Sequence, residues 1–134
     1  MAFDYRTSFI KTHPDNIVCH ATFTLHPGDP QKIKEKMADI RASRKTKQPH
    51  GPSAGSWFKN PKEGSAGQLL DEASCKGLTV GGAKISPYHA NFFLNTGGAT
   101  ATDLLRLSEK AKALVEAKFN VLLETEIKIV PERI

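Results

Sequence analysis

The chain has 134 residues, 39% of them hydrophobic and 25% charged, which suits one folded domain with a single modest core and excludes a disordered chain. Its formal net charge of +5 favours anionic partners without identifying one.

The N-terminus reads MAFDYRTSFIK and has charged residues where a signal peptide has an apolar run. No window reaches the ~20 apolar residues of a membrane span, so we expect a cytoplasmic protein without membrane contact. Cys19 and Cys75 lie far apart in apolar or helix-like sequence and predict two buried thiols rather than a disulfide. The five histidines show no metal-ligand spacing, so we expect no metal site.

The first predicted elements are a strand and a helix. From about residue 16 to 26, apolar side chains alternate with others, which is typical of a strand with one buried face. Asp29 and Pro30 then supply an N-cap and a first-turn proline for a helix that runs to about residue 45. The apolar stripe of this helix consists of Ile33, Met37 and Ile40. The basic stretch with two prolines that follows predicts a linker.

A compact unit is predicted from about residue 50. SAGQLLDEASCKG indicates a short helix with Ser65 and Gln68 in capping-box spacing and Gly77 at its end. LTVGGAKIS and ANFFLN are typical of short strands, and the glycine pair in the first permits a bulge or a close approach of two backbones.

The longest helix is predicted after residue 100, with Thr100 and Asp103 as a capping box and Asn120 at its end. The last segment, VLLETEIKIV, predicts a strand whose apolar face is opposite Glu124, Glu126 and Lys128.

The order of these elements predicts the α+β class, because strands and helices mix without a regular repeat. We expect a small mixed sheet packed against two or three helices, preceded by an orphaned strand and a connecting helix. The predicted divisions are residues 1–27, 28–49 and 50–134.

GPSAGSWFKNP, at residues 51–61, is the first candidate for chemistry. It indicates a glycine-flanked turn that exposes the Ser56 hydroxyl. It is not a P-loop, because Gly55 is followed by Ser56 and Trp57, and not a nucleophile elbow, because Phe58 stands where that motif needs glycine. A turn or capping hydroxyl is the alternative reading.

Two further features favour structural roles. The glycine pairs at 81 and 97 are more typical of turns than of anion sites, although the second precedes a helix N-terminus. A basic cluster formed by Arg41, Arg44, Lys45 and Lys47 lacks interleaved aromatics and lies at a helix C-terminus, so it indicates a solvated helix end and no nucleic-acid site.

YRTS, KQP, PSAGSWFKNP, AGQLLDEASCKGLTVGGAKIS, HANFFLN and LLETEIKIV occur in an order that resembles the C-terminal portion of UDP-N-acetylenolpyruvoylglucosamine reductases. The resemblance covers nearly the whole chain, and the spacing between Arg6 and Ser56 is that of the shorter branch, which lacks a tyrosine-bearing loop. It departs locally at Thr125 and Lys128, where the family usually has proline and arginine.

The resemblance implies a flavin-dependent reduction in peptidoglycan synthesis. NADPH reduces FAD, hydride reaches the vinyl carbon of UDP-N-acetylglucosamine enolpyruvate, and a proton quenches the carbon that bears the carboxylate. Ser56 matches the proton donor, with Lys59 as a stabilising cation; Arg6 matches the arginine that meets the substrate carboxylate, and Glu126 matches the carboxyl group that stabilises the enol-like intermediate.

Weaker matches imply substrate contacts at Asn60, Lys47 and His89. The resemblance makes residues 1–27 the end of an FAD-binding domain and residues 50–134 the substrate-binding domain. The flavin region is then missing, so we expect no bound cofactor and no turnover unless that domain is supplied in cis or in trans. The alternatives are a flavin-free module that binds UDP-sugars or nucleic acid. The orphaned strand also predicts a homodimer formed by paired strand edges.

Overall fold

The structure is a computed structural model that describes residues 2–130. The chain divides into two compact units, Met1–Glu35 and Lys36–Ile134, and each is described by itself. Within residues 2–130, no helix combines the length and the apolar character needed to cross a bilayer.

The first unit contains a tight turn, a short helix and an extended segment. Asp4 and Thr7 exchange backbone hydrogen bonds of 3.1 Å across the turn. Helix α1, Phe9–Thr12, follows, and the Ser8 hydroxyl accepts a hydrogen bond from Lys11 N at 3.3 Å as its N-cap. The turn and helix are therefore held by local hydrogen bonds.

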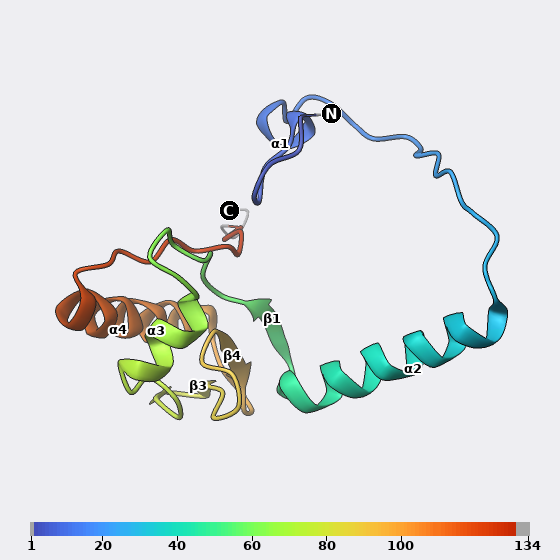
Figure 1. Ribbon diagram of the computed structural model, residues 1–134. Helices are drawn as coiled ribbons and strands as arrows, with labels where there is room; N and C mark the ends of the chain where they lie inside the picture. Colours follow the sequence, from blue (N-terminus) through green and yellow to red (C-terminus); the bar gives the residue numbers. More distant parts are fainter. Residues whose placement is uncertain (1, 131–134) are drawn as a thin grey trace. The chain divides into compact units, whose positions relative to one another are not determined.

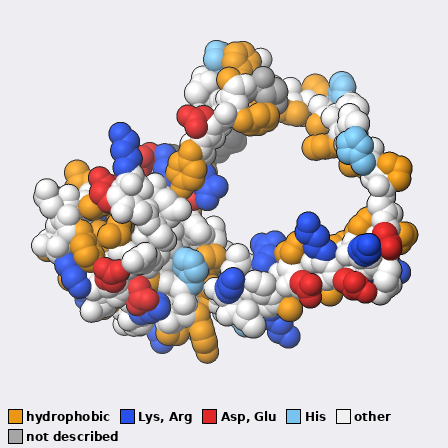
Figure 2. Space-filling view, in the orientation of Figure 1, with side chains coloured by type: hydrophobic (Ala, Val, Ile, Leu, Met, Phe, Trp, Pro, Cys, Tyr) orange, Lys and Arg blue, Asp and Glu red, His pale blue; other side chains and the backbone are white. Residues whose placement is uncertain are grey.

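The predicted strand at residues 16–26 is wrong for this structure, because that segment has no regular secondary structure and is exposed. Figure 2 shows hydrophobic side chains in the open along it. Cys19 is exposed with it, which corrects the prediction of a buried thiol. The alternation is present in the sequence, but a strand forms only where a second strand satisfies its backbone hydrogen bonds.

Helix α2, Pro30–Lys47, begins where the sequence predicts. The Asp29 carboxylate accepts hydrogen bonds from Gln31 N at 2.8 Å and Lys32 N at 3.4 Å, which makes it the N-cap. The helix has no buried residue, and Figure 2 shows basic and acidic side chains together along it.

The second unit contains a four-stranded sheet with the order β1-β4-β3-β2. The strands are β1 Ser53–Ser56, β2 Thr79–Val80, β3 Ala83–Ile85 and β4 Phe92–Asn95. All three pairings are antiparallel, which corrects the predicted mixed sheet. The links from β2 to β3 and from β3 to β4 are too short for the crossover that parallel strands require.

Two helices pack beside this sheet, as Figure 1 shows: α3, Ala66–Glu72, and α4, Ala101–Phe119. The capping box of α4 is confirmed, and Asn120 ends the helix in the left-handed conformation with a φ of 54°. Leu107 and Val115 of α4 are fully buried and contribute to a core with side chains from the sheet. The α+β class is therefore confirmed, with two helices on the sheet.

The C-terminal segment is extended but forms no ladder within residues 121–130. A single antiparallel bridge joins Thr125 to Phe58. Val121 and Leu123 are buried, while Leu122 and Glu124 are exposed, so the predicted alternation holds through this part. The hydrogen bonds to residues 57–59 involve Glu124 and Glu126. Ile129 lies beyond them in the chain and is exposed.

Candidate functional site

Ser56 lies at the end of β1 and not in a turn. It pairs with Phe92 of β4, and the register of the two strands shifts between Ser53 and Ser56. Gly55 has a φ of 82° at this irregularity, a backbone conformation that glycine adopts without strain. Ser56 is half-buried. The many turn-forming residues of this stretch therefore build a bulged edge strand that ends at the serine.

Trp57, which follows Ser56, anchors the strand in the core. Its ring is stacked on Phe93, with centroids 4.6 Å apart and planes 11° from parallel. Its indole Nε1 donates a hydrogen bond of 2.8 Å to the hydroxyl of Ser108 in α4, and Ser108 is itself buried. The long helix thus fixes the residue next to Ser56 in position.

Asn91 forms hydrogen bonds with the backbone of Trp57 and Phe58. Its Oδ1 accepts from Phe58 N and its Nδ2 donates to Phe58 O, both at 2.8 Å, while its backbone carbonyl accepts from Trp57 N at 2.8 Å. The residue is only 4% exposed. The sequence analysis did not select Asn91. Its position directly before the apolar run FFL could have indicated it, because a polar side chain buried next to such a run needs hydrogen-bond partners.

Glu126 is placed next to this strand by backbone hydrogen bonds. Glu126 N donates to Trp57 O at 2.8 Å, and Lys59 N donates to Glu124 O at 2.8 Å. Because Trp57 follows Ser56 directly, the backbone brings the predicted proton donor at the end of β1 next to the extended segment that carries the predicted carboxyl group. Glu126 is half-buried, whereas Glu124 is exposed.

Lys59 forms an ion pair with the Glu124 carboxylate. Its side chain is less exposed than that of its partner, at 28% against 73%. The predicted stabilising cation is therefore three residues from Ser56 and held by a carboxylate on the strand that carries Glu126. An exposed partner of this kind limits the motion of Lys59 without removing its positive charge from the site.

Asn60 caps α3, because its Oδ1 accepts a hydrogen bond of 3.0 Å from Ala66 N. The capping box predicted for Ser65 and Gln68 is wrong, since Ser65 makes no side-chain hydrogen bond as N-cap and Gln68 instead donates to Glu72 at 2.8 Å. The helix ends at Glu72 and not at Gly77. A predicted substrate contact thus also has a structural role.

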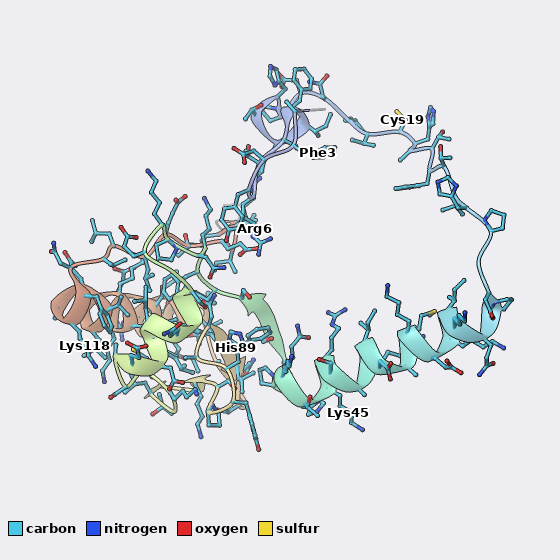
Figure 3. The ribbon with its side chains drawn as sticks, viewed as in Figure 1. Phe3, Arg6, Cys19, Lys45, His89 and Lys118 are labelled. Carbon is cyan, nitrogen blue, oxygen red and sulfur yellow. The ribbon has the colours of Figure 1, made fainter. Side chains whose placement is uncertain are left out.

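His89 lies in the turn before β4, labelled in Figure 3. Its Nδ1 accepts a hydrogen bond of 3.2 Å from Asn91 N, and its ring meets Phe92 edge-on with centroids 4.9 Å apart. Lys47 is the exposed last residue of α2.

Arg6 belongs to the first unit and makes contacts with its sequence neighbours there. It lies in the turn at Asp4–Thr7 with a φ of 57°. Its backbone carbonyl accepts a hydrogen bond of 2.6 Å from Lys11 Nζ, and its guanidinium lies 5.3 Å from the centroid of the Tyr5 ring. The structure thus brings Ser56, Lys59 and Glu126 onto neighbouring segments of the second unit. The roles of these residues, and those of Lys47, Asn60, His89 and Arg6, stay predictions.

The glycine pair at 97 lies in the loop before α4, where the Asn95 side chain binds the backbone. Asn95 Oδ1 accepts hydrogen bonds from Gly97 N at 2.9 Å and Ala99 N at 3.1 Å. At the N-terminus of α4, Thr100 N donates to the Asp103 carboxylate at 2.9 Å, and this hydrogen bond lowers the pKa of Asp103. Since these amides already have acceptors, the helix start is occupied by the protein's own carboxylate rather than arranged for an anion.

Cys75 is fully buried, and its burial raises the pKa of the thiol. A neutral buried thiol is a small core side chain and not a nucleophile. Among residues 2–130, no group of three or more His, Cys, Asp or Glu side chains is arranged to hold a metal ion.

Comparison with known proteins places these features in a family. Residues 46–130 match the sequence profile described as UDP-N-acetylenolpyruvoylglucosamine reductase, C-terminal domain. Similar curated relatives, both named UDP-N-acetylenolpyruvoylglucosamine reductase, come from Rubrobacter xylanophilus, 40% identical over 98% of this chain and 44% of the relative, and Caldanaerobacter subterraneus, 45% identical over 99% of this chain and 44% of the relative.

The crystal structure of UDP-N-acetylenolpyruvylglucosamine reductase from Thermus caldophilus is similar, with a TM-score of 0.63 and 42% identity. The match covers 75% of this chain and 35% of that one. The chain spans less than half the length of the relatives that it matches.

Proposed function

The chain belongs to the UDP-N-acetylenolpyruvoylglucosamine reductase family, and from this premise we propose that it forms the substrate-binding and proton-donating part of such an oxidoreductase in peptidoglycan synthesis. The substrate would be UDP-N-acetylglucosamine enolpyruvate and the product UDP-N-acetylmuramate. One observation carries the proposal: the residue that follows Ser56 is hydrogen-bonded to Glu126, through Trp57 O and Glu126 N.

Ser56 would donate the proton to the carbon that bears the carboxylate. A serine hydroxyl is a weak acid, so the alkoxide that forms needs nearby positive charge. Lys59, three residues along the chain, would supply that charge, and it is paired with the exposed Glu124 carboxylate. The anchoring of Trp57 and Phe58 by Ser108 and Asn91 keeps the serine backbone from shifting during the reaction.

Glu126 would stabilise the enol-like intermediate, and Arg6 would bind the substrate carboxylate. A guanidinium suits this second task because it is permanently charged and presents paired N–H donors to a carboxylate. Asn60, Lys47 and His89 would contact the rest of the substrate. Asn60 Oδ1 accepts from Ala66 N at 3.0 Å, so the residue that would contact the substrate also holds the start of α3.

FAD and NADPH are implied by the family, and we assign neither to a site among residues 2–130. Within residues 2–130 no glycine-rich strand-turn-helix unit of the kind that holds a dinucleotide occurs. The start of α4 follows two glycines, but Asp103 and Asn95 already accept from its amides. We therefore assign the flavin to another part of the enzyme, in cis or in trans, and derive no step through it. The reaction would take place in the cytoplasm.

We do not extend the proposal to a homodimer. That expectation depended on a strand at residues 16–26, and the segment forms none in the structure.

The test is a chimera in which this chain replaces the matching C-terminal portion of the Thermus caldophilus enzyme. The chimera should bind flavin and oxidise NADPH only when the enolpyruvyl substrate is present. Ser56→Ala should lower kcat by about 10²–10⁴-fold, the range typical of a lost general acid, while flavin absorbance stays unchanged. A folded, flavin-loaded chimera without substrate-dependent oxidation, or a Ser56→Ala variant as fast as the parent, would contradict the proposal.

A further inference from the structure

An apolar hollow of about 250 Å³ lies on the second unit, between β1, the start of α4 and the C-terminal segment. Its lining includes Ala54 and Trp57, then Ala101, Leu104 and Leu105 of α4, and residues 127–130. Residues 121–130 leave the end of α4 and return toward its start, as Figure 1 shows. Three segments that are distant in sequence therefore form one concave apolar surface.

The walls of this hollow are open to water on one side and fixed on the other. Leu105 is 37% exposed, Ile129 55% and Val130 75%, whereas Trp57 is only 3% exposed. The Trp57 ring is held by its stack on Phe93, so this wall is part of the core. Replacing water at such a surface with an apolar group is favourable, which predicts an occupant with an apolar body.

The volume of the hollow limits the size of that body. An apolar cavity of about 150 Å³ binds benzene, which has six heavy atoms, so about 250 Å³ admits about ten heavy atoms on the same scale. Drug-sized ligands occupy sites of about 300–1,000 Å³. The hollow therefore suits a single ring or a short aliphatic chain and is too small for a nucleotide.

Positive charge lies at the rim of the hollow. Lys128 is the single charged residue among the described residues that line it. The first turn of α4 is also part of the lining, and the helix dipole places partial positive charge there. Asp103, the acidic residue of that turn, does not line the hollow; a Cβ built on Gly81 would lie 2.5 Å from its carboxylate, which is therefore at the β2–β3 turn. An anionic head group suits this rim.

We propose that this hollow binds a small amphiphilic carboxylate of the medium-chain fatty acid type, with its chain against Leu104 and Leu105 and its carboxylate at Lys128. A chain of eight carbons with its two carboxylate oxygens has the ten heavy atoms that the volume admits. Ser56, Lys59 and Glu126 do not line the hollow, so the site goes beyond the proposed function and does not depend on it.

The experiment is a fluorescence titration of the 134-residue chain with butanoate, hexanoate, octanoate and decanoate, each below its micelle concentration. Trp57 is the single tryptophan and forms part of the wall, so its emission reports on occupancy. The affinity should rise by up to about fourfold for each added methylene and level off near eight carbons, where the hollow is full. Octanol, which has the same chain without the charge, should bind more weakly than octanoate.

Two variants with matched controls test the two parts of the site. Ala101→Leu fills the hollow and should weaken octanoate binding at least about tenfold, which is the loss of two buried methylenes. Ala117→Leu is its control, because Ala117 is an exposed alanine of the same helix that does not line the hollow. Lys128→Gln should abolish the preference for octanoate over octanol and its salt dependence, whereas Lys110→Gln, at an exposed position of α4 away from the lining, should bind like the parent.

The proposal is overturned if octanoate shows no saturable binding, if Ala101→Leu binds it as tightly as Ala117→Leu does, or if octanol and octanoate bind equally well. The titration needs no flavin and no sugar nucleotide, so it is independent of the chimera assay. An inactive chimera with octanoate binding retained would refute the proposed function alone. An active chimera with no octanoate binding to the chain would refute this site alone.

Discussion

Replacing Asn91 with alanine should loosen the strand that carries Ser56. The Asn91 amide makes two hydrogen bonds of 2.8 Å to the backbone N–H and C=O of Phe58, and Phe58 is itself only 1% exposed. Asn91→Ala removes both partners and leaves two buried backbone groups without a hydrogen bond. The hydrogen bond from Trp57 N to the Asn91 carbonyl is unaffected, because it uses the backbone.

The size of the effect follows from burial. A buried polar group left without a partner costs about 1–3 kcal/mol, so the two Phe58 groups together should lower the free energy of unfolding by about 2–6 kcal/mol. This is a large part of the 5–15 kcal/mol that is typical of whole domains.

The assay is urea unfolding followed by tryptophan fluorescence. Trp57 is the single tryptophan of the chain and lies between Ser56 and Phe58, so the signal reports on this strand. The matched control is Asn95→Ala, which also removes two hydrogen bonds, both accepted by the asparagine Oδ1, but in an exposed loop where water replaces the lost acceptor. The control should lose less than about 1 kcal/mol.

Equal losses for Asn91→Ala and Asn95→Ala would refute the reasoning, because burial would then not decide the cost. A loss below about 1 kcal/mol for Asn91→Ala would show that Phe58 finds other partners. Hydrogen exchange locates the effect: protection should fall at Phe58 N–H before it falls in α4.

Three further outcomes are expected. Ser108→Ala leaves the indole N–H without its buried acceptor and should cost about 1–3 kcal/mol in the same unfolding assay. Thr100→Ala should cost about 1 kcal/mol at neutral pH through loss of the N-cap. Since the hydrogen bond from Thr100 N lowers the pKa of Asp103, the stability from that carboxylate is present above its unfolded pKa and lost as pH falls through the folded value, so the urea midpoints of Asp103→Ala and parent should converge in acid. A thiol reagent at pH 8 should modify exposed Cys19 quickly and Cys75 only in denaturant, because burial raises the Cys75 pKa; two fast thiols in the native chain would contradict this.

Local patterns predicted the helices of this protein well. Asp29 caps α2, and Thr100 and Asp103 form the capping box of α4, as their spacing predicts. Asn120 ends α4 where the periodicity stops. These features involve residues within four positions of each other, so the sequence itself contains the interacting groups.

The errors arise where a hydrogen-bond partner is distant in sequence. Residues 16–26 alternate like a strand but have no second strand to pair with, whereas Ser53–Ser56 contain turn formers and pair with β4. Helix α3 takes its cap from Asn60 and not from Ser65, because the chain before the helix folds back onto its N-terminus.

For the candidate site, the motifs predicted Ser56, Lys59 and Glu126 through their resemblance to a family. Tertiary structure decided which hydrogen bonds fix their backbone: Trp57 O accepts from Glu126 N, and the Asn91 amide accepts from Phe58 N, 33 positions away in the sequence. A residue's spacing reveals which neighbours it meets within a turn or a strand. Hydrogen bonds between distant segments depend on how the core packs, and only the folded chain determines that.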